Sequence, residues 1–353
     1  MAFTDIEAIK GYLKKYDKEL ITQALNGNTL AQSLTVKRNL RTKWAFPKIV
    51  VDGGIRPHDT NIVNAKGGRT LTERTMEPNI GMKIISYIEQ EVRETFMSEM
   101  FGVNEKMPMA KFFAQAELKK LNQEVNDNFY MAEKKTYAAF NPATAYAVGA
   151  RFLFNEIVYQ NISIGATTAG ETPVSHAAKF QDVDAVAILD GPNKRIVTAV
   201  ASEGLAYAQT GAFSETDGYE YIKEMWDVLP EAHKNLGMTA KVSFDVAQDI
   251  VERINSRFGS GMGIGNADIE EGKPFVLKNT GGRLKIQPVT WMKDSRRIIM
   301  APAGNMTLGY DLESDTNSFG KIVENLHGFT TIAKWIMDFN FSDLETLYVN
   351  DQL

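Results

Sequence analysis

The side chains that most often carry catalysis or bind metals are sparse in this sequence and stand far apart. The four histidines are His58, His176, His233 and His327, and none has a second ligand at a metal-binding spacing such as i, i+4. His58 and Asp59 are neighbours on a segment expected to be extended, where adjacent side chains point to opposite faces. Asp59 therefore could not orient His58 as a catalytic base. Each histidine is therefore predicted to be an ordinary loop or surface residue.

A glycine-rich run, GSGMGIGN at Gly259–Asn266, has the composition of a phosphate-binding loop. The dinucleotide-binding fingerprint needs a strand before its glycines and a helix after them. This run instead follows a predicted helix and precedes the acidic residues Asp268, Glu270 and Glu271. No Gly-Lys-Ser/Thr sequence completes a phosphate loop either. We interpret the run as a connecting loop and expect no nucleotide cofactor.

Three acidic residues alternate in YDLESDTN, at Asp311, Glu313 and Asp315, as the oxygen ligands of a cation could. The run lacks the glycine and the terminal glutamate of a calcium loop. We expect these carboxylates to be solvated or to meet basic groups such as Arg296 and Arg297 on a neighbouring copy. Since no nucleophile stands out beside a suitable base, the sequence predicts no catalytic residue, no metal site and no enzyme.

The composition narrows the class of protein. The chain of 353 residues, 44% of them hydrophobic, suffices for two domains or for one domain with large excursions. Lys and Arg number 39 against 44 Asp and Glu, so no dedicated nucleic-acid-binding surface is expected. The absence of cysteine excludes disulfides and thiolate metal sites. No apolar stretch resembles a signal peptide or a membrane span, so we expect a soluble, intracellular chain without a membrane partner.

The elements are organised around a long run without glycine or proline, Lys111–Phe140. Its apolar residues fall at three- and four-residue steps and predict one buried stripe along an α-helix: Leu118, Leu121, Val125, Phe129, Ala132 and Ala139. At about 1.5 Å per residue this helix would be roughly 45 Å long. We interpret it as a rigid spine against which distant strands pack. The simpler alternative is a long amphipathic helix of an ordinary α+β protein.

The segment before the spine, Asp52–Asn79, contains two Gly-Gly pairs, two prolines and few large apolar residues. It is long for an ordinary loop, and the charged or hydroxyl groups on both faces of residues 70–77 exclude a core strand. We predict an arm of two polar strands with its tip at Gly67-Gly68. Such an arm has little core of its own and needs a neighbour to rest on. After it, Ile80 and Met82 begin an alternation that predicts a strand entering the core.

C-terminal to the spine, the sequence predicts helices followed by an α/β region. Helices are expected over Ala143–Tyr159, from Pro192 to just before Gly204, over Thr216–Leu229 and from Val246 to Phe258. A surface loop is expected at Ser163–Asp182, and strands at Thr239–Phe244, Leu284–Val289, Arg297–Met300 and Met306–Tyr310. The clearest strand follows, because Trp335, Met337, Phe339 and Phe341 alternate with Lys334, Ile336, Asp338 and Asn340.

This order of parts resembles the major capsid proteins of tailed bacteriophages, whose fold is shared with encapsulins and herpesvirus capsid proteins. The resemblance covers most of the chain and includes DGPNKRIV from Asp190, LPEAHK, TAKVSFDVAQDIVERI, GRLKIQPV and SRRIIMAP. It implies an α+β fold with an N-arm at 1–47, an extended E-loop at 48–88 and a peripheral domain at 89–215 that contains the spine helix at 111–140. The implied fold also has an axial domain at 216–303, and residues 304–353 return to the peripheral domain.

The resemblance further implies a virion protein, assembled in the host cytoplasm, whose hexamers and pentamers close an icosahedral shell around double-stranded DNA without binding it specifically. Portal, scaffold or decoration proteins are further partners in such a system. The assembly contacts expected in the arm are Arg56, Lys66, Gly67, Gly68, Arg69, Glu73 and Arg74. One alternative is an encapsulin-like shell around protein cargo. The other is a nucleotide- or metal-using enzyme built on the glycine run and the acidic cluster.

Overall fold

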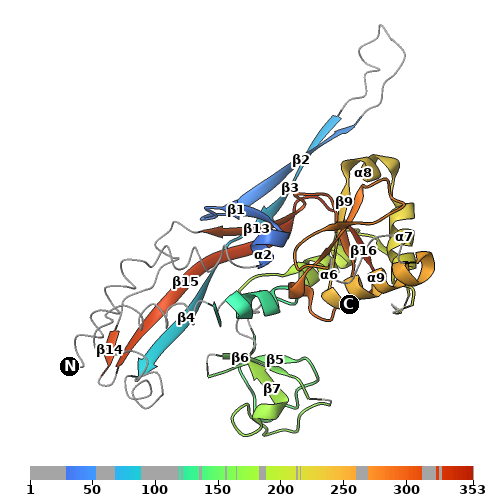
Figure 1. The fold of residues 1–353 in the computed structure, drawn as a ribbon. Coiled ribbons are helices and arrows are strands. Elements are labelled where there is room, and N and C mark those ends of the chain that lie inside the picture. The colour runs from blue at the N-terminus through green and yellow to red at the C-terminus, as the bar shows by residue number, and fades with distance from the viewer. Residues whose placement is uncertain are drawn as a thin grey trace, which may run out of the picture.

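The computed structural model describes residues 29–52, 68–88, 119–120, 122–134, 137–155, 157–163, 165–182, 188–211, 214, 216–259, 269–311, 323–325 and 328–352. Helices and strands alternate irregularly in this part of the chain and build two hydrophobic cores. An arm projects from the cores on one side, and a small lobe lies on another (Figure 1). The α+β class predicted from the sequence is confirmed.

The first sheet is built on one long strand, β15 (Gly328–Phe341). One edge of β15 pairs antiparallel with β4 (Asn79–Ile88), and its other edge pairs with β13 (Met306–Asp311) and β14 (Val323–Asn325). The short helix α2 (Thr29–Ser33) leads into β1 (Thr35–Arg38), which pairs parallel with β13. Segments from both ends of the sequence therefore lie side by side in this sheet (Figure 1).

The core under the first sheet is rich in aromatic side chains. Phe129 lies with its ring centroid 5.3 Å from Trp291 and 5.3 Å from Phe339, in edge-to-face arrangements. Helix α6 (Pro192–Ser202) adds Ile196 to the same cluster. Proline at its first position and Gly204 beyond its end, at φ +73°, bound α6 as predicted.

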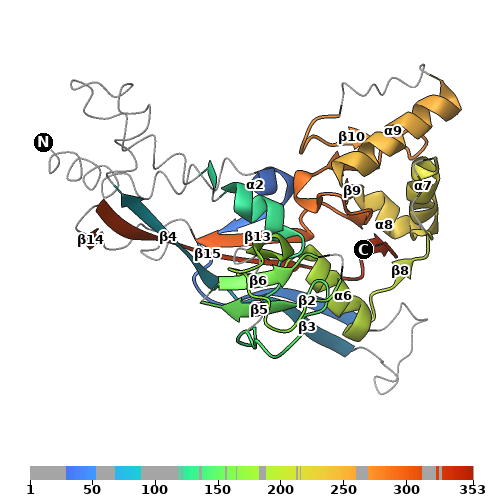
Figure 2. The same ribbon diagram turned by 90° about the horizontal axis from the view of Figure 1, so that it is seen from below.

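The second core lies between a sheet and helices α7 (Gly218–Val228) and α9 (Phe244–Phe258), while the short helix α8 (Glu231–Leu236) buries none of its side chains. The sheet runs in the order β10 (Phe275–Val276), β11 (Leu284–Pro288), β9 (Met238–Val242), β12 (Ile299–Ala301), β16 (Tyr348–Asn350) and β8 (Tyr207–Ala208). Helix α9 buries Val246, Ile250 and Ile254 at the predicted four-residue steps. Ser243 caps it by accepting a hydrogen bond from the Val246 N–H. Figure 2 shows these helices gathered at one end of the molecule.

The lobe, residues 137–182, is held together by its own aromatic side chains. It contains β5 (Arg151–Phe154), β6 (Ile157–Asn161), the 3-10 turn η2 (Ala177–Lys179) and β7 (Phe180–Asp182). Phe152 is buried, and its ring centroid lies 4.3 Å from that of Tyr146 and 5.1 Å from that of Phe140. The predicted helix over Ala143–Tyr159 is wrong, because this aromatic-rich stretch forms a hairpin instead.

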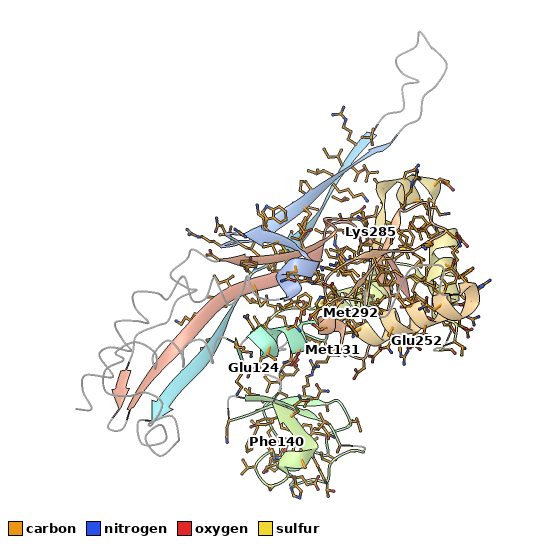
Figure 3. All side chains as sticks on the ribbon, viewed as in Figure 1. Glu124, Met131, Phe140, Glu252, Lys285 and Met292 are labelled. Atoms are coloured by element: carbon orange, nitrogen blue, oxygen red, sulfur yellow. The ribbon has the colours of Figure 1, made fainter. Side chains whose placement is uncertain are left out.

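The predicted spine helix ends earlier than the sequence indicated. Residues 119–120 and 122–129 are helical, and Val125 and Phe129 are buried as expected, whereas residues 111–118 lie outside the described part of the chain. The helical continuation to Phe140 is wrong. Beyond Phe129 the carbonyls of Tyr130 and Ala132 accept hydrogen bonds from the N–H groups of Asn193 and Gly191, at the start of α6. Figure 3 shows Met131 at the end of the helix and Phe140 in the separate lobe.

This junction leaves no room for a side chain at Gly191. A Cβ atom there would lie 2.0 Å from the Phe129 carbonyl oxygen and 2.9 Å from that of Tyr130, both of them backbone atoms. We expect Gly191→Ala to lower the free energy of unfolding by about 2 kcal/mol or more, measured by denaturant unfolding. Gly165→Ala is the matched control, because its Cβ would meet nothing within 4 Å. Equal stabilities of the two variants would contradict this packing.

Candidate assembly interface

The arm is a two-stranded antiparallel hairpin. Strands β2 (Trp44–Asp52) and β3 (Gly68–Met76) pair in unbroken register from Trp44 opposite Met76 to Asp52 opposite Gly68. The predicted arm strands are therefore present. Gly68 pairs with Asp52 rather than forming the tip. Residues 53–67 lie outside the described part. The outer ends of both strands extend well beyond the two cores (Figure 1).

One face of the arm exposes three aliphatic side chains next to charged ones. Ile49, Val51 and Leu71 are 64%, 66% and 70% exposed, respectively. Ile49 stands directly opposite Leu71, and Val51 stands opposite Arg69, so the alternation of a strand puts all four side chains on one face. We call this the apolar arm face. In Figure 3 the side chains near the outer end of the arm stand clear of every other drawn element.

The opposite face of the arm contacts the body through ion pairs. The Lys48 Nζ lies 2.7 Å from the Asp343 Oδ1 and 2.7 Å from the Glu345 Oε2, in the segment after β15. Burial alone would lower the pKa of Lys48, but the hydrogen bonds to these two carboxylates outweigh it and raise that pKa. Burial alone would raise the pKa of Asp343, but the hydrogen bond from Lys48 and the other polar contacts of this carboxylate outweigh burial and lower that pKa. The pair is therefore charged on both sides at neutral pH.

Arg74 makes the second attachment, also within its own chain. Its Nε donates to the Phe341 carbonyl oxygen at 3.0 Å, its Nη2 donates to the Asn340 Oδ1 at 3.3 Å, and its Nη1 pairs with Glu203. Arg74 was predicted to contact a neighbouring copy. The structure shows its guanidinium engaged at the root of its own arm.

Two buried polar side chains of β15 fix the backbone where β3 turns into β4. The Asp338 Oδ2 accepts a hydrogen bond from the Glu77 N–H at 2.7 Å, and the Asn340 Nδ2 donates to the Thr75 carbonyl oxygen at 2.7 Å. Asp338 is 2% exposed and Asn340 is 3% exposed. Burial raises the pKa of Asp338, and the nearby Arg195 offsets part of this rise. Neither residue was singled out from the sequence.

Exposed apolar residues continue on β4, close to the arm root. Ile80 and Met82 are 61% and 64% exposed, although their alternation predicted a core-facing side. That prediction is wrong at these two positions, because pairing with β15 satisfies the backbone of β4 but leaves these two side chains uncovered. Gly81, on the opposite face, is buried instead.

Among the other predicted assembly contacts, Arg69 and Glu73 are exposed on β3 and share a face with Leu71. Arg56, Lys66 and Gly67 lie outside the described residues.

The candidate chemical residues are scattered. His176 is exposed next to Ser175, and the His233 Nδ1 lies 2.5 Å from the Tyr348 hydroxyl. Asp311 is fully buried and therefore not solvated. It meets a basic group, as the other expectation had it, but that group is Arg41 of its own chain, at 3.4 Å. Glu313, Asp315, His58, His327 and residues 260–266 lie outside the described part. Within that part, no three His, Asp or Glu side chains gather as a metal site would require.

No described helix has the length and apolar character to cross a bilayer.

The fold is similar to capsids among solved structures. The capsid of Myoviridae phage XM1 matches with a TM-score of 0.48 and 13% identity, over 91% of this chain and 90% of that chain. The capsid of cyanophage A-1(L) matches with a TM-score of 0.48 and 9% identity, over 92% of each chain. A virus-like particle from Pyrococcus furiosus matches with a TM-score of 0.44 and 8% identity, over 96% of this chain and 99% of that chain. No family model and no curated protein matches the sequence.

Removing the Asn340 side chain should loosen the arm without unfolding the cores. We expect Asn340→Ala to reduce the hydrogen-exchange protection of residues 44–52 and 68–76 by about tenfold or more, because the Thr75 carbonyl and Arg74 lose a buried partner. The control is Asn350→Ala, an equally buried amide that bonds the Ile298 N–H and the Arg296 carbonyl in the second sheet. Unchanged arm protection in Asn340→Ala would contradict the anchoring role.

The Lys48 ion pair should make arm attachment pH-dependent. Because the pKa of Asp343 is lowered in the fold, its contribution is present above its unfolded value, 3.8, and is lost as the pH falls through its folded value. We expect Lys48→Met to cost about 0.5–1 kcal/mol at pH 7, as a partly exposed ion pair does. Denaturant unfolding should show this difference from the wild type shrinking toward pH 3. A difference independent of pH would contradict the assignment.

Proposed function

We propose that this chain is a capsid-type shell subunit whose arm packs on a neighbouring copy. The observation that carries the proposal is the two-faced arm. Polar contacts tie one face of the arm to the body, while Ile49, Val51 and Leu71 are exposed to solvent on the other face. An exposed apolar patch on a projecting element is typical of an interaction surface.

The physical argument for a second copy rests on burial. Covering an exposed Val, Ile or Leu side chain is worth about 1.5–3 kcal/mol, so the apolar arm face gains stability only when something packs on it. If the partner is another copy, every subunit both offers an arm and receives one. Such heterologous contacts close into rings when the rotation between copies closes. Rings of this kind are the capsomers expected from the resemblance.

Within this proposal the shell is icosahedral, is built of hexamers and pentamers, and encloses double-stranded DNA in a virion assembled in the host cytoplasm. The balance of 39 basic and 44 acidic residues supports a container that does not grip its contents, since a strongly basic lumen would bind DNA in a salt-dependent way. Residues 48–88 act as the E-loop, and Arg69 and Glu73 flank the apolar contact. Portal, scaffold or decoration proteins would complete the particle.

Assembly tests the proposal directly. We expect Leu71→Asp to leave the subunit folded, because Leu71 is exposed, but to abolish the rings, tubes or closed shells seen by negative-stain electron microscopy after size exclusion. Thr70→Asp is the matched control, since it places the same charge one residue away on the opposite face. Unimpaired assembly of Leu71→Asp, or a wild type that stays monomeric with and without a scaffold, would contradict the proposal. DNA inside native particles indicates a virion, and protein cargo indicates an encapsulin-like compartment.

A further inference from the structure

Two exposed aliphatic side chains beside the arm root take no part in the contacts described above. Ile80 and Met82 alternate onto one face of β4, where they are 61% and 64% exposed. Directly opposite them on β15 stand Ile336 and Lys334. Ile336 is buried, whereas Lys334 is exposed, so a basic side chain stands beside Met82 on the same face. We call Ile80, Met82 and Lys334 the root patch.

The root patch offers a receiving surface for the arm, an inference that rests on the function proposed above. A heterologous contact joins two different surfaces, so an arm that packs on a neighbour needs a second patch to pack on. Leu71 cannot reach the root patch of its own chain, because β4 continues the line of the hairpin away from its outer end (Figures 1 and 2). An arm that packs there therefore comes from another copy.

The arm and the root patch carry opposite charges at matching positions. On the apolar arm face, Glu73 follows Leu71 by two residues, about 7 Å along β3. On the root patch, Met82 follows Ile80 at the same interval, and Lys334 stands about 5 Å across from Met82. When β3 lies along β4 with Leu71 on Ile80, Glu73 comes to Met82, within reach of Lys334.

We propose that the root patch binds the apolar arm face of a second copy, with Leu71 of one copy against Ile80 and Met82 of the next and with Glu73 paired to Lys334. The packing removes aliphatic side chains of both copies from water, and the ion pair sets the direction in which the arm lies. The root patch of the first copy takes the arm of a third, so the contact propagates around a ring. This contact accounts for the exposure of Ile80 and Met82 in the single chain.

Charge exchange tests the ion pair. Assembly is followed as the lowest subunit concentration at which size exclusion and negative-stain electron microscopy show rings, tubes or shells. We expect Glu73→Lys and Lys334→Glu each to raise this concentration about tenfold or more, because each brings like charges together. The double variant should return it to within about threefold of the wild-type value. Single variants that assemble like the wild type, or a double variant that recovers nothing, would overturn the proposal.

Met82→Asp tests the aliphatic part of the contact. Because Met82 is exposed, the variant should fold normally and should raise the assembly concentration about tenfold or more. Val228→Asp is the control, because Val228 is 79% exposed but lies on α7, beside the second core. Normal assembly of Met82→Asp while Leu71→Asp fails would mean that the arm packs elsewhere, and it would overturn this inference alone. Normal assembly of both variants, or a wild type that never assembles, would overturn the proposed function with it.

Discussion

The course of the arm depends on the buried polar side chains of one strand. A two-stranded hairpin has too little core to hold itself in one direction. Strand β15 supplies what is missing, because Phe339 and Phe341 on one face fill the first core while Asp338 and Asn340 on the other face bond the backbone at the arm root. Core and arm therefore share a single element, so the position of β15 in the core fixes the direction of the arm root.

This attachment determines what the arm can do. Hydrogen bonds and ion pairs at the root fix geometry but contribute modest stability, and the partly exposed Lys48 pair is worth little alone. The apolar arm face adds nothing to the isolated chain, since its side chains remain in solvent. A neighbour that covers this face stabilises the arm by mass action, so the ordered arm is favoured where copies meet. The proposed assembly function rests on this difference in arm stability between a free subunit and a subunit in contact with a neighbouring copy.

Local patterns predicted the elements whose neighbours are close in sequence. The four-residue steps of α9 and the polar side chains on both faces of residues 70–77 were sufficient, because each pattern shows which side of the element faces solvent. The glycines of the arm did not locate its tip, since Gly68 belongs to β3. The end of the spine at Phe129 was not predictable, since it depends on Gly191, far along the chain. Asp338 and Asn340 were missed because they alternate with aromatic residues as a solvent face would. Ile336 shares their face and is buried, and it was the available signal that this face is covered.

The most direct measurement uses the fact that the chain has no cysteine. A single thiol introduced by Leu71→Cys reports on the apolar arm face, and Thr70→Cys reports on the other face of the same strand. Maleimide labelling rates are compared for free subunits and for assembled particles. The account predicts that the Leu71→Cys thiol reacts rapidly in free subunits and about tenfold or more slowly in particles, as burial of that site requires. Equal rates for Leu71→Cys in both states would contradict it.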